Sequence, residues 1–313
     1  MTLQFEQISL SLKTLQHRVV NRYRFNLKRI SVIKVHLGIR GARPKGETPR
    51  DNSLLKLNKN YALGRKGTYV EPPRDRVIYE AIKNYGSWEL KESKFLSLGL
   101  IAASSKNDSK VAFLDIGANS GLVSLQTMNL SKTFNEVFLF EPIPQHVSAI
   151  MHNLRNFSHI HINDFALSDH DGTAEMFTEL TNFGNTSIFD TVVPEAGRTS
   201  KIINLVETSS YCDRFLNNFD KYVIKCDTQG MDALILSRFP ERIWQKCQSA
   251  VIEVWALPEI SNIDVEGVLS MFKGFDHVSW QPYSDEDISL SEVMEFWLSK
   301  SSASKNLFLS RNS

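Results

Sequence analysis

The sequence predicts an α/β protein with a doubly wound, mostly parallel seven-stranded sheet. Short apolar runs alternate with helical patterns from about residue 110 to the end of the chain. A glycine-rich turn follows the first of these runs, and acidic residues follow several others. Repeated alternation of strand and helix gives a parallel sheet with helices on both faces, and such sheets bind ligands at the carboxyl ends of their strands. We therefore expect the functional residues at those ends.

A basic extension precedes this domain. The first 75 residues contain about 16 Lys and Arg against about 5 Asp and Glu, although the whole chain has a formal net charge of only +1. The patterns predict an amphipathic helix over residues 8–23, a short strand over 30–37 and a Gly, Pro and Arg-rich linker over 38–52. Since the boundary falls near Pro72-Pro73, the domains are residues 1–74 and 75–313.

The extension has two competing interpretations. Its basic, amphipathic helix is suited to peripheral contact with a membrane surface or to oligomerisation. Packing of the same helix on the catalytic domain, with its charges in water, fits the pattern equally well. We expect no nucleic-acid partner, because the extension carries no recognisable reading motif.

The elements of the second domain follow in order. Two helices, near residues 77–85 and 87–101 with Ser87 as a possible cap, precede the first core strand. Residues 173–177 and 202–206 are expected as edge strands of an insertion, and helices are expected over 231–236, 265–272 and 290–298. The seven predicted core strands are residues 111–114, 137–140, 159–162, 222–226, 250–254, 277–280 and 307–309.

The turn after the first strand points to a cofactor. Gly117 and Gly121 allow the backbone to approach a ligand closely, a feature that several nucleotide-binding folds share. Asp115 discriminates among them, because a carboxylate at this strand end would repel a pyrophosphate on the helix N-terminus. S-adenosylmethionine (SAM) has no phosphate and presents an ammonium and a sulfonium, which an acidic residue can help to hold.

The next two strand ends supply further candidate contacts. Glu141 ends the second strand, where an acidic residue accepts hydrogen bonds from ribose hydroxyls; alone, it could equally be a helix N-terminal carboxylate. After the third strand, Asp164 could accept from the adenine amino group, and Phe165 or Ala166 could pack on the ring. A polar loop without a ligand is the alternative for this segment.

The fourth and fifth strand ends carry the candidate catalytic groups. Asp227 could meet the methionine ammonium or an acceptor hydroxyl, whereas Lys225 is best explained by an ion pair with Asp227 or another acidic neighbour. Glu253 and Trp255 could line an acceptor pocket. The candidate base is Asp227 first, Glu253 second and a divalent cation third.

Taken together, these motifs resemble the FkbM family of methyltransferases over about two-thirds of the chain. The matching pieces are Phe-Leu-Asp-Ile-Gly-Ala-Asn-Ser-Gly-Leu, Phe-Glu-Pro, Ala-Leu-Ser-Asp, Lys-Cys-Asp-Thr-Gln-Gly-Met-Asp and Ile-Glu-Val. The resemblance implies a Rossmann-like class I methyltransferase domain and transfer of a methyl group from SAM to a hydroxyl, often on a sugar or a polyketide. It implies cofactor-binding roles for Asp115, Gly117, Asn119, Gly121, Glu141 and Asp227, to which we add Ala118 and Pro142 of the same motifs.

This chain departs from the family pattern at the fourth strand. The family usually reads Lys-Ile-Asp-Val-Glu-Gly-Ala-Glu there, whereas Gln229 and Asp232 replace the two glutamates in this sequence. Asp227 is kept. The resemblance therefore supports a role for Asp227 and leaves proton transfer by residue 229 in doubt.

The composition of the chain indicates its expected compartment and bears on metal binding. Three irregularly spaced cysteines, the lack of a secretory signal and the lack of a run of about 20 apolar residues predict a reduced, cytoplasmic protein. His159 and His161 share a strand face, but no third ligand has usable spacing, so we expect no metal site.

Two rival functions remain open at this stage. An NAD-dependent oxidoreductase is disfavoured by Asp115 and by the Gly-x-x-x-Gly spacing. A noncatalytic Rossmann-like binding protein would keep the fold without the chemistry. The acceptor is expected to be a small molecule or a glycan, and the polar segment 182–187 is either a loop closing over it or an ordinary exposed loop.

Overall fold

The computed structural model describes residues 61–64, 67–70, 76–105, 109–133, 136–179, 182–193, 195, 197–258 and 263–312. The helix expected over 8–23, the strand over 30–37, the linker over 38–52 and the boundary near Pro72-Pro73 lie outside the described residues. Within the predicted extension, β1 (Tyr61–Gly64) and β2 (Gly67–Val70) pair as an antiparallel hairpin.

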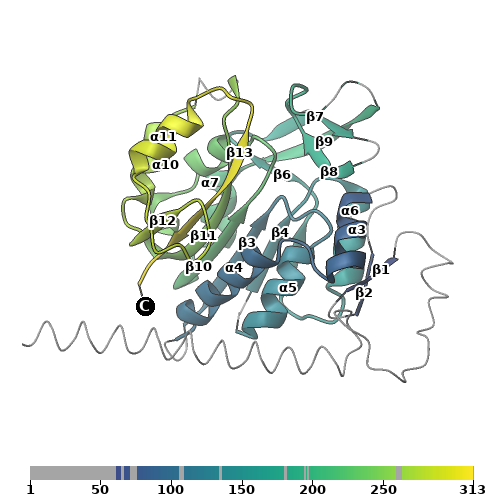
Figure 1. The fold of residues 1–313 in the computed structure, drawn as a ribbon, viewed down its shortest axis with the longest axis horizontal. Helices are drawn as coiled ribbons and strands as arrows, with labels where there is room; N and C mark the ends of the chain where they lie inside the picture. The colour runs from purple at the N-terminus through teal and green to yellow at the C-terminus, as the bar shows by residue number, and fades with distance from the viewer. Residues whose placement is uncertain are drawn as a thin grey trace, which may run out of the picture.

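The seven-stranded sheet confirms the predicted fold class (Figure 1). Its order is β12-β13-β11-β10-β3-β4-β5, and only β13 runs antiparallel to its neighbours. The strands are β3 (Val111–Ile116), β4 (Glu136–Phe140), β5 (Ile160–Asn163), β10 (Lys221–Cys226), β11 (Cys247–Trp255), β12 (His277–Ser279) and β13 (Ser304–Ser310). Because β3 pairs with both β4 and β10, the direction of winding reverses between β3 and β10, which is where ligands bind in open α/β sheets.

Helices cover both faces of this sheet, and strand β3 shows how. Val111 and Phe113 belong to a core with α3 (Arg76–Tyr85), α4 (Leu90–Ala103), α5 (Leu122–Ser131) and α6 (Pro144–Asn153). Leu114 and Ile116 point to the opposite core, because successive side chains of a strand face opposite sides. That second core contains α7 (Thr208–Phe215), α8 (Asp232–Ser237), α9 (Glu241–Lys246), α10 (Val265–Phe272) and α11 (Leu290–Trp297).

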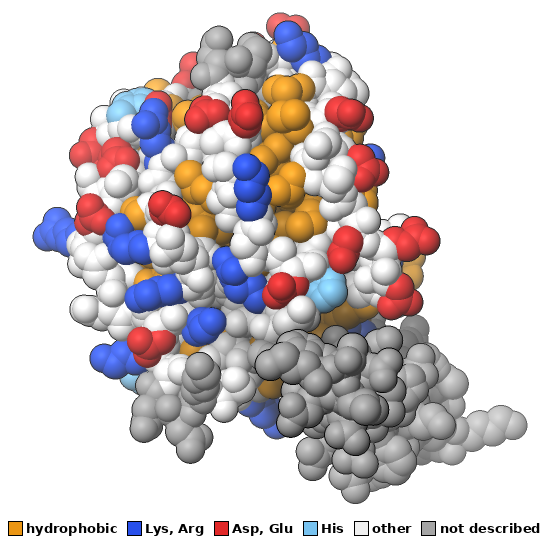
Figure 2. All heavy atoms as spheres, turned by 90° about the vertical axis from the view of Figure 1, so that its left-hand side faces the viewer, with side chains coloured by type: hydrophobic (Ala, Val, Ile, Leu, Met, Phe, Trp, Pro, Cys, Tyr) orange, Lys and Arg blue, Asp and Glu red, His pale blue; other side chains and the backbone are white. Residues whose placement is uncertain are grey.

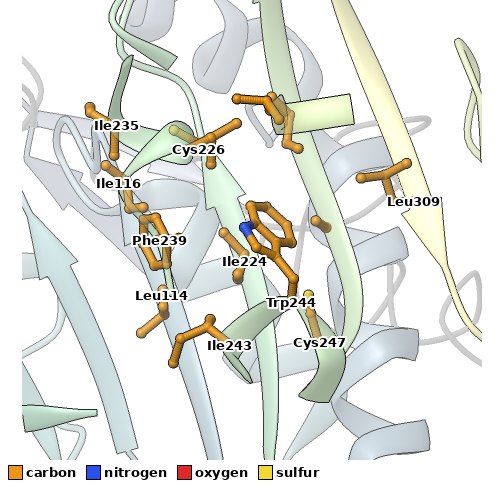
Figure 3. Close-up of a cluster of buried hydrophobic side chains, with 14 of the residues drawn as sticks. Leu114, Ile116, Ile224, Cys226, Ile235, Phe239, Ile243, Trp244, Cys247 and Leu309 are labelled. Atoms are coloured by element: carbon orange, nitrogen blue, oxygen red, sulfur yellow. The ribbon is translucent and has the colours of Figure 1, made fainter. Parts of the chain in front are cut away.

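Trp244 lies in the middle of the second core (Figure 3). Its ring is 1% exposed and makes an edge contact with Phe272 at a centroid distance of 5.1 Å. Cys212, Cys226 and Cys247 are buried free thiols on this face. Burial raises the pKa of Cys212 and of Cys247 to about 12, so these thiols act as small apolar core groups.

The start of α4 differs from the expected cap. The helix begins at Leu90, and Glu89 rather than Ser87 occupies the N-cap position. Glu89 has a left-handed backbone with φ 43° and makes no side-chain cap hydrogen bond. Ser87 lies too far before Leu90 to accept hydrogen bonds from the free N–H groups of the first helical turn. The side chain of Glu89 instead lines the site described below.

The insertion forms a separate four-stranded sheet, and the strands that contain residues 173–177 and 202–206 are its two inner strands rather than edge strands. Its order is β6-β9-β7-β8, with β6 (Ala166–Ser168), β7 (Gly172–Glu179), β8 (Asn182–Ser187) and β9 (Arg198–Glu207). Met176, Ile203 and Leu205 share a small core with Ile143, which follows β4. The apolar residues of this second sheet are thus buried near the end of β4. Figure 1 shows the second sheet above the main sheet.

Figure 2 shows one face of the molecule, on which acidic and basic side chains are interspersed around a strip of apolar side chains. Basic side chains also lie over aromatic rings of the protein. The ammonium of Lys305, for example, lies 4.4 Å from the ring centroid of Phe296.

Among the described helices, none combines the length and apolar character that crossing a bilayer requires.

Candidate functional site

A cavity of about 480 Å³ opens at the carboxyl ends of β3, β4 and β10. It lies at the point where the winding reverses, and it is also lined by Met176 and Leu205 of the second sheet and by Ile188, which follows β8. The volume falls within the range of small-molecule sites. Of the predicted site residues, those in the lining are Gly117, Ala118, Asn119, Glu141, Pro142, Ala166, Asp227, Glu253 and Trp255.

Gly117 forms the floor of this cavity. Its N–H and that of Ala118 both donate to the carbonyl of Phe140, which ties the ends of β3 and β4 together. The backbone has φ 75°, and a Cβ on Gly117 would lie 1.8 Å from the carbonyl oxygen of Asp227. Only glycine fits here, because the ends of β3 and β10 approach too closely for a side chain.

Glu141 is a buried carboxylate beside this turn, with 5% of its surface exposed. Its Oε2 accepts the N–H of Asn119 at 2.9 Å, and its Oε1 accepts the N–H of Ile143 at 2.9 Å. The ring of His146, which sequence reasoning did not single out, places Nδ1 3.2 Å from Oε1. These contacts orient the carboxylate at the end of β4, where hydroxyl groups of a ligand can reach it.

Asp115 lies beneath the cavity rather than in its lining. Its carboxyl is fully buried, accepts the hydroxyl of Ser124 at 2.5 Å and lies 3.7 Å from the ammonium of Lys225. Burial raises the pKa of Asp115, and Lys225 and Ser124 act against that rise. In this structure Asp115 therefore contacts protein groups, and direct contact with a cofactor stays a prediction.

Lys225 forms the ion pair expected from the sequence. Its Nζ lies 3.1 Å from Oδ2 of Asp227 and 3.4 Å from the carbonyl oxygen of Gly117. Burial lowers the pKa of Lys225, but Asp227 and Asp115 together raise it above its ordinary value, so the ammonium keeps its proton. The same pair lowers the pKa of Asp227, although burial alone would raise it. Asp227 is therefore the ionised carboxylate of the site.

Glu253 is the second carboxyl of the predicted catalytic pair. Its Oε2 accepts hydrogen bonds from the Gln229 side-chain amide at 3.0 Å and from the Trp255 indole N–H at 2.5 Å. Burial raises the pKa of Glu253 well above its ordinary value, and the negative charge of Asp227 raises it further. Burial and the charge of Asp227 therefore favour the protonated form of Glu253, whereas Lys225 favours the ionised form of Asp227.

Glu89 is a cavity residue that sequence reasoning missed. Burial raises the pKa of Glu89 to about 8, and Asp227 adds to the rise. Asn306 of β13 and Gln229 also line the cavity without having been assigned a role. No local signal marks Glu89, since it precedes an ordinary helical pattern and reaches the site only through the packing of α4 on the sheet.

The predicted adenine segment is only partly at the cavity. Ala166 contributes to the lining, whereas Asp164 and Phe165 do not. Asp164 is exposed, and Phe165 packs against Phe140 and Tyr211 with centroid distances of 6.1 and 5.8 Å. Gly121, which precedes α5 with φ 74°, also lies outside the lining. Cofactor contacts by these residues stay predictions.

Two further sequence features can now be placed. Asn185 and Thr186 of β8 line the cavity, so this part of the polar insertion segment faces the site. His159 and His161 instead flank Glu136, at nitrogen–oxygen distances of 3.4 and 2.6 Å. In the described part of the chain, no group of three His, Cys, Asp or Glu side chains is arranged to hold a metal ion.

No protein-family model and no curated protein matches this chain. Among solved structures, it is similar to the methyltransferase FkbM from Methylobacillus flagellatus KT, with 15% identity, 64% of this chain and 43% of that chain covered, and a TM-score of 0.39. It is also similar to precorrin-6y C5,15-methyltransferase from Geobacter metallireducens GS-15, with 12% identity, coverage of 78% and 95%, and a TM-score of 0.35.

A chain of a fibrillarin/Nop5p complex is 13% identical, with coverage of 81% and 98% and a TM-score of 0.35. The chain spans less than half the length of the FkbM structure. Each of these TM-scores is below 0.5, and membership of the FkbM family stays an expectation.

Proposed function

We propose that this protein is a SAM-dependent methyltransferase that methylates a hydroxyl group of a small molecule or glycan. The observation that carries the proposal is the arrangement at the switch point. A glycine turn that admits no side chain lies between a buried, oriented carboxylate, Glu141, and an ionised carboxylate, Asp227. SAM needs this combination of close backbone approach, a hydroxyl acceptor and a negative charge.

The residues present fit the cofactor. Gly117 keeps the turn compact, because a Cβ there would collide with the backbone of Asp227, and Glu141 would accept the ribose hydroxyls. Phe140, Leu167 and Ile235 offer an apolar wall for the adenine beside Ala166. Asp227 supplies negative charge for the ammonium and sulfonium groups. Bound SAM would supply an electrophilic methyl group on its sulfonium sulfur.

The same site disfavours a dinucleotide. Asp115, Glu141 and Asp227 surround the turn on which a pyrophosphate would rest, and Lys225 is already paired with two of them. An uncompensated anion in this position would be repelled by the carboxylates. The charge of the described residues therefore favours a cationic cofactor over NAD.

Asp227 is the proposed proton acceptor. The Asp227 carboxylate would take up the hydroxyl proton of the acceptor, while bound SAM would supply the methyl group to that oxygen and leave as S-adenosylhomocysteine. Asp227 is the better candidate for this step because Lys225 lowers its pKa and favours the ionised form, whereas burial raises the pKa of Glu253 and favours the protonated form. Holding acceptor and cofactor in line supplies the larger share of the acceleration, up to ~7–11 kcal/mol.

The first experiment is calorimetric titration of the protein with S-adenosylhomocysteine and, separately, with NAD. We expect saturable binding of S-adenosylhomocysteine and none of NAD. Asp227→Asn should weaken S-adenosylhomocysteine binding by about tenfold, the effect of losing about 1.4 kcal/mol. Asp285→Asn is the matched control, because Asp285 is exposed and outside the cavity lining. Binding of NAD without S-adenosylhomocysteine would refute the proposal.

A second experiment separates an enzyme from a noncatalytic binding protein. Radiolabelled SAM is incubated with the protein and a size-fractionated extract of the source cell, and the labelled product is identified. We expect base-stable label in a small molecule or glycan, as methyl ethers resist mild alkali. Label that never exceeds the Asp227→Asn background would contradict catalysis.

A further inference from the structure

Gln229 bridges the two carboxyl groups of the catalytic pair. Its side-chain Nε2 donates to Oδ1 of Asp227 at 3.1 Å and to Oε2 of Glu253 at 3.0 Å. An amide nitrogen has two hydrogens, so both are used. Gln229 is thus the uncharged group that lies between the end of β10 and the end of β11.

The backbone of Gln229 is held in a conformation that side-chain-bearing residues rarely adopt. Its φ is 54°, in the left-handed region, which is strained for a residue with a side chain. Ser187 at the end of β8 donates its hydroxyl to the Gln229 carbonyl at 2.7 Å and is itself fully buried. The second sheet therefore fixes the turn that carries the bridging amide.

We propose that Gln229 is a positioning residue that holds Asp227 and Glu253 as a pair sharing one proton and keeps Asp227 ionised. This inference rests on the proposed function, since the charge of Asp227 is what the cofactor and the acceptor proton require. It assigns a role to residue 229, where the FkbM family pattern usually has a glutamate.

The charges around the pair give Gln229 this role. The groups facing Asp227 are Lys225 on β10, Asp115 on β3, Asp232 in α8, Glu89 before α4 and Glu253 on β11. Lys225 is the one cation among them, and it already contacts Asp115 and Asp227. A neutral amide donor lowers the pKa of Asp227 without adding charge, whereas a carboxylate at the same place would raise it.

The test compares Gln229→Ala, Gln229→Glu and the control Gln281→Glu, in which the same chemical change is made at an exposed position. The probe is S-adenosylhomocysteine, titrated by calorimetry between pH 5 and 8.5. Thermal unfolding of each variant checks that it is folded at every pH used. Methyl transfer is not needed, so an unidentified acceptor does not block the experiment.

In the wild type, Asp227 stays ionised and the affinity for S-adenosylhomocysteine should change little over this range. In Gln229→Ala the affinity should fall on the acid side relative to the wild type, because removal of this hydrogen-bond donor raises the pKa of Asp227. Gln229→Glu should lose affinity at a still higher pH, because a third carboxyl raises that pKa further. Both variants should approach wild-type affinity near pH 8.5, and Gln281→Glu should match the wild type throughout.

A loss of affinity that is equal at every pH would show that Gln229 only supports the fold, and would overturn the inference. So would two Gln229 variants that keep the wild-type pH profile. If the wild type itself binds no S-adenosylhomocysteine at any pH, the proposed function falls, and this inference falls with it. The wild-type titration thus distinguishes the two failures.

Discussion

Replacing Gly117 by alanine tests the geometry on which the cofactor site depends. The added Cβ would lie 1.8 Å from the carbonyl oxygen and 2.8 Å from the carbonyl carbon of Asp227. Both atoms belong to backbone, which cannot rotate away as a flexible side chain can. The ends of β3 and β10 must therefore move apart, and Asp227 must move with them.

The size of the effect follows from two contributions. A left-handed backbone costs an alanine about 1–2 kcal/mol. Overpacking against immovable neighbours adds about 1–3 kcal/mol, for a total of about 2–5 kcal/mol of unfolding free energy. Gly197 provides the matched control, since it has φ 82° and a Cβ added to it would meet no described atom within 4 Å. Gly197→Ala should show the first contribution alone.

Urea unfolding of both variants measures these free energies, and calorimetry with S-adenosylhomocysteine measures the effect on the site. We expect Gly117→Ala to bind at least tenfold more weakly than the wild type and Gly197→Ala to bind normally, because small displacements of an aligned group are costly. If Gly117→Ala were no less stable than Gly197→Ala and bound with wild-type affinity, the close approach of β3 and β10 would be refuted.

Two further predictions concern buried charge. Lys225→Met should destabilise the protein by about 3–5 kcal/mol at pH 8, because it leaves the carboxyl groups of Asp115 and Asp227 without their cation. The loss of stability should be smaller at pH 5, where those carboxyls can take up protons. Urea unfolding at both pH values measures the two losses, and equal losses would contradict the prediction. For Glu89, the pKa rises from 4.5 to about 8 on folding, mainly through burial, so the folded state binds more protons than the unfolded state. The contribution of Glu89 to the free energy of unfolding is complete below pH 4.5 and is lost as the pH rises through 8. The Glu89→Gln variant should therefore gain stability relative to the wild type between these pH values. Parallel curves of stability against pH for the two proteins would contradict the raised pKa of Glu89.

The order of elements in the main domain could be predicted from local patterns. A strand that is buried on both faces needs apolar residues at successive positions. The runs at 111–114 and 222–226 meet this requirement except at Lys225, and both form central strands. The insertion could not be placed in the same way. Strands 172–179 and 198–207 carry the alternation of a sheet with one exposed face, but alternation does not say which sheet they join.

The same division applies to the candidate site. Gly117, Glu141 and Asp227 were identifiable because each follows a strand, and the ends of parallel strands meet at one edge. The behaviour of each carboxyl was not identifiable, because it depends on neighbours far apart in sequence. Asp115 lies outside the cavity lining, where it contacts Ser124 and Lys225, and Glu89 reaches the cavity from the N-cap of a helix that precedes the sheet.

The sequence by itself determined the fold class, the strand ends that carry function and the acidic character of the site, because periodicity and turn residues are local properties of the chain. Only the tertiary structure decided in which direction the pKa of each carboxyl is shifted. That outcome depends on burial and on distances of 3 to 4 Å between groups on different strands, such as Lys225 and Asp115, and no pattern along one strand contains them.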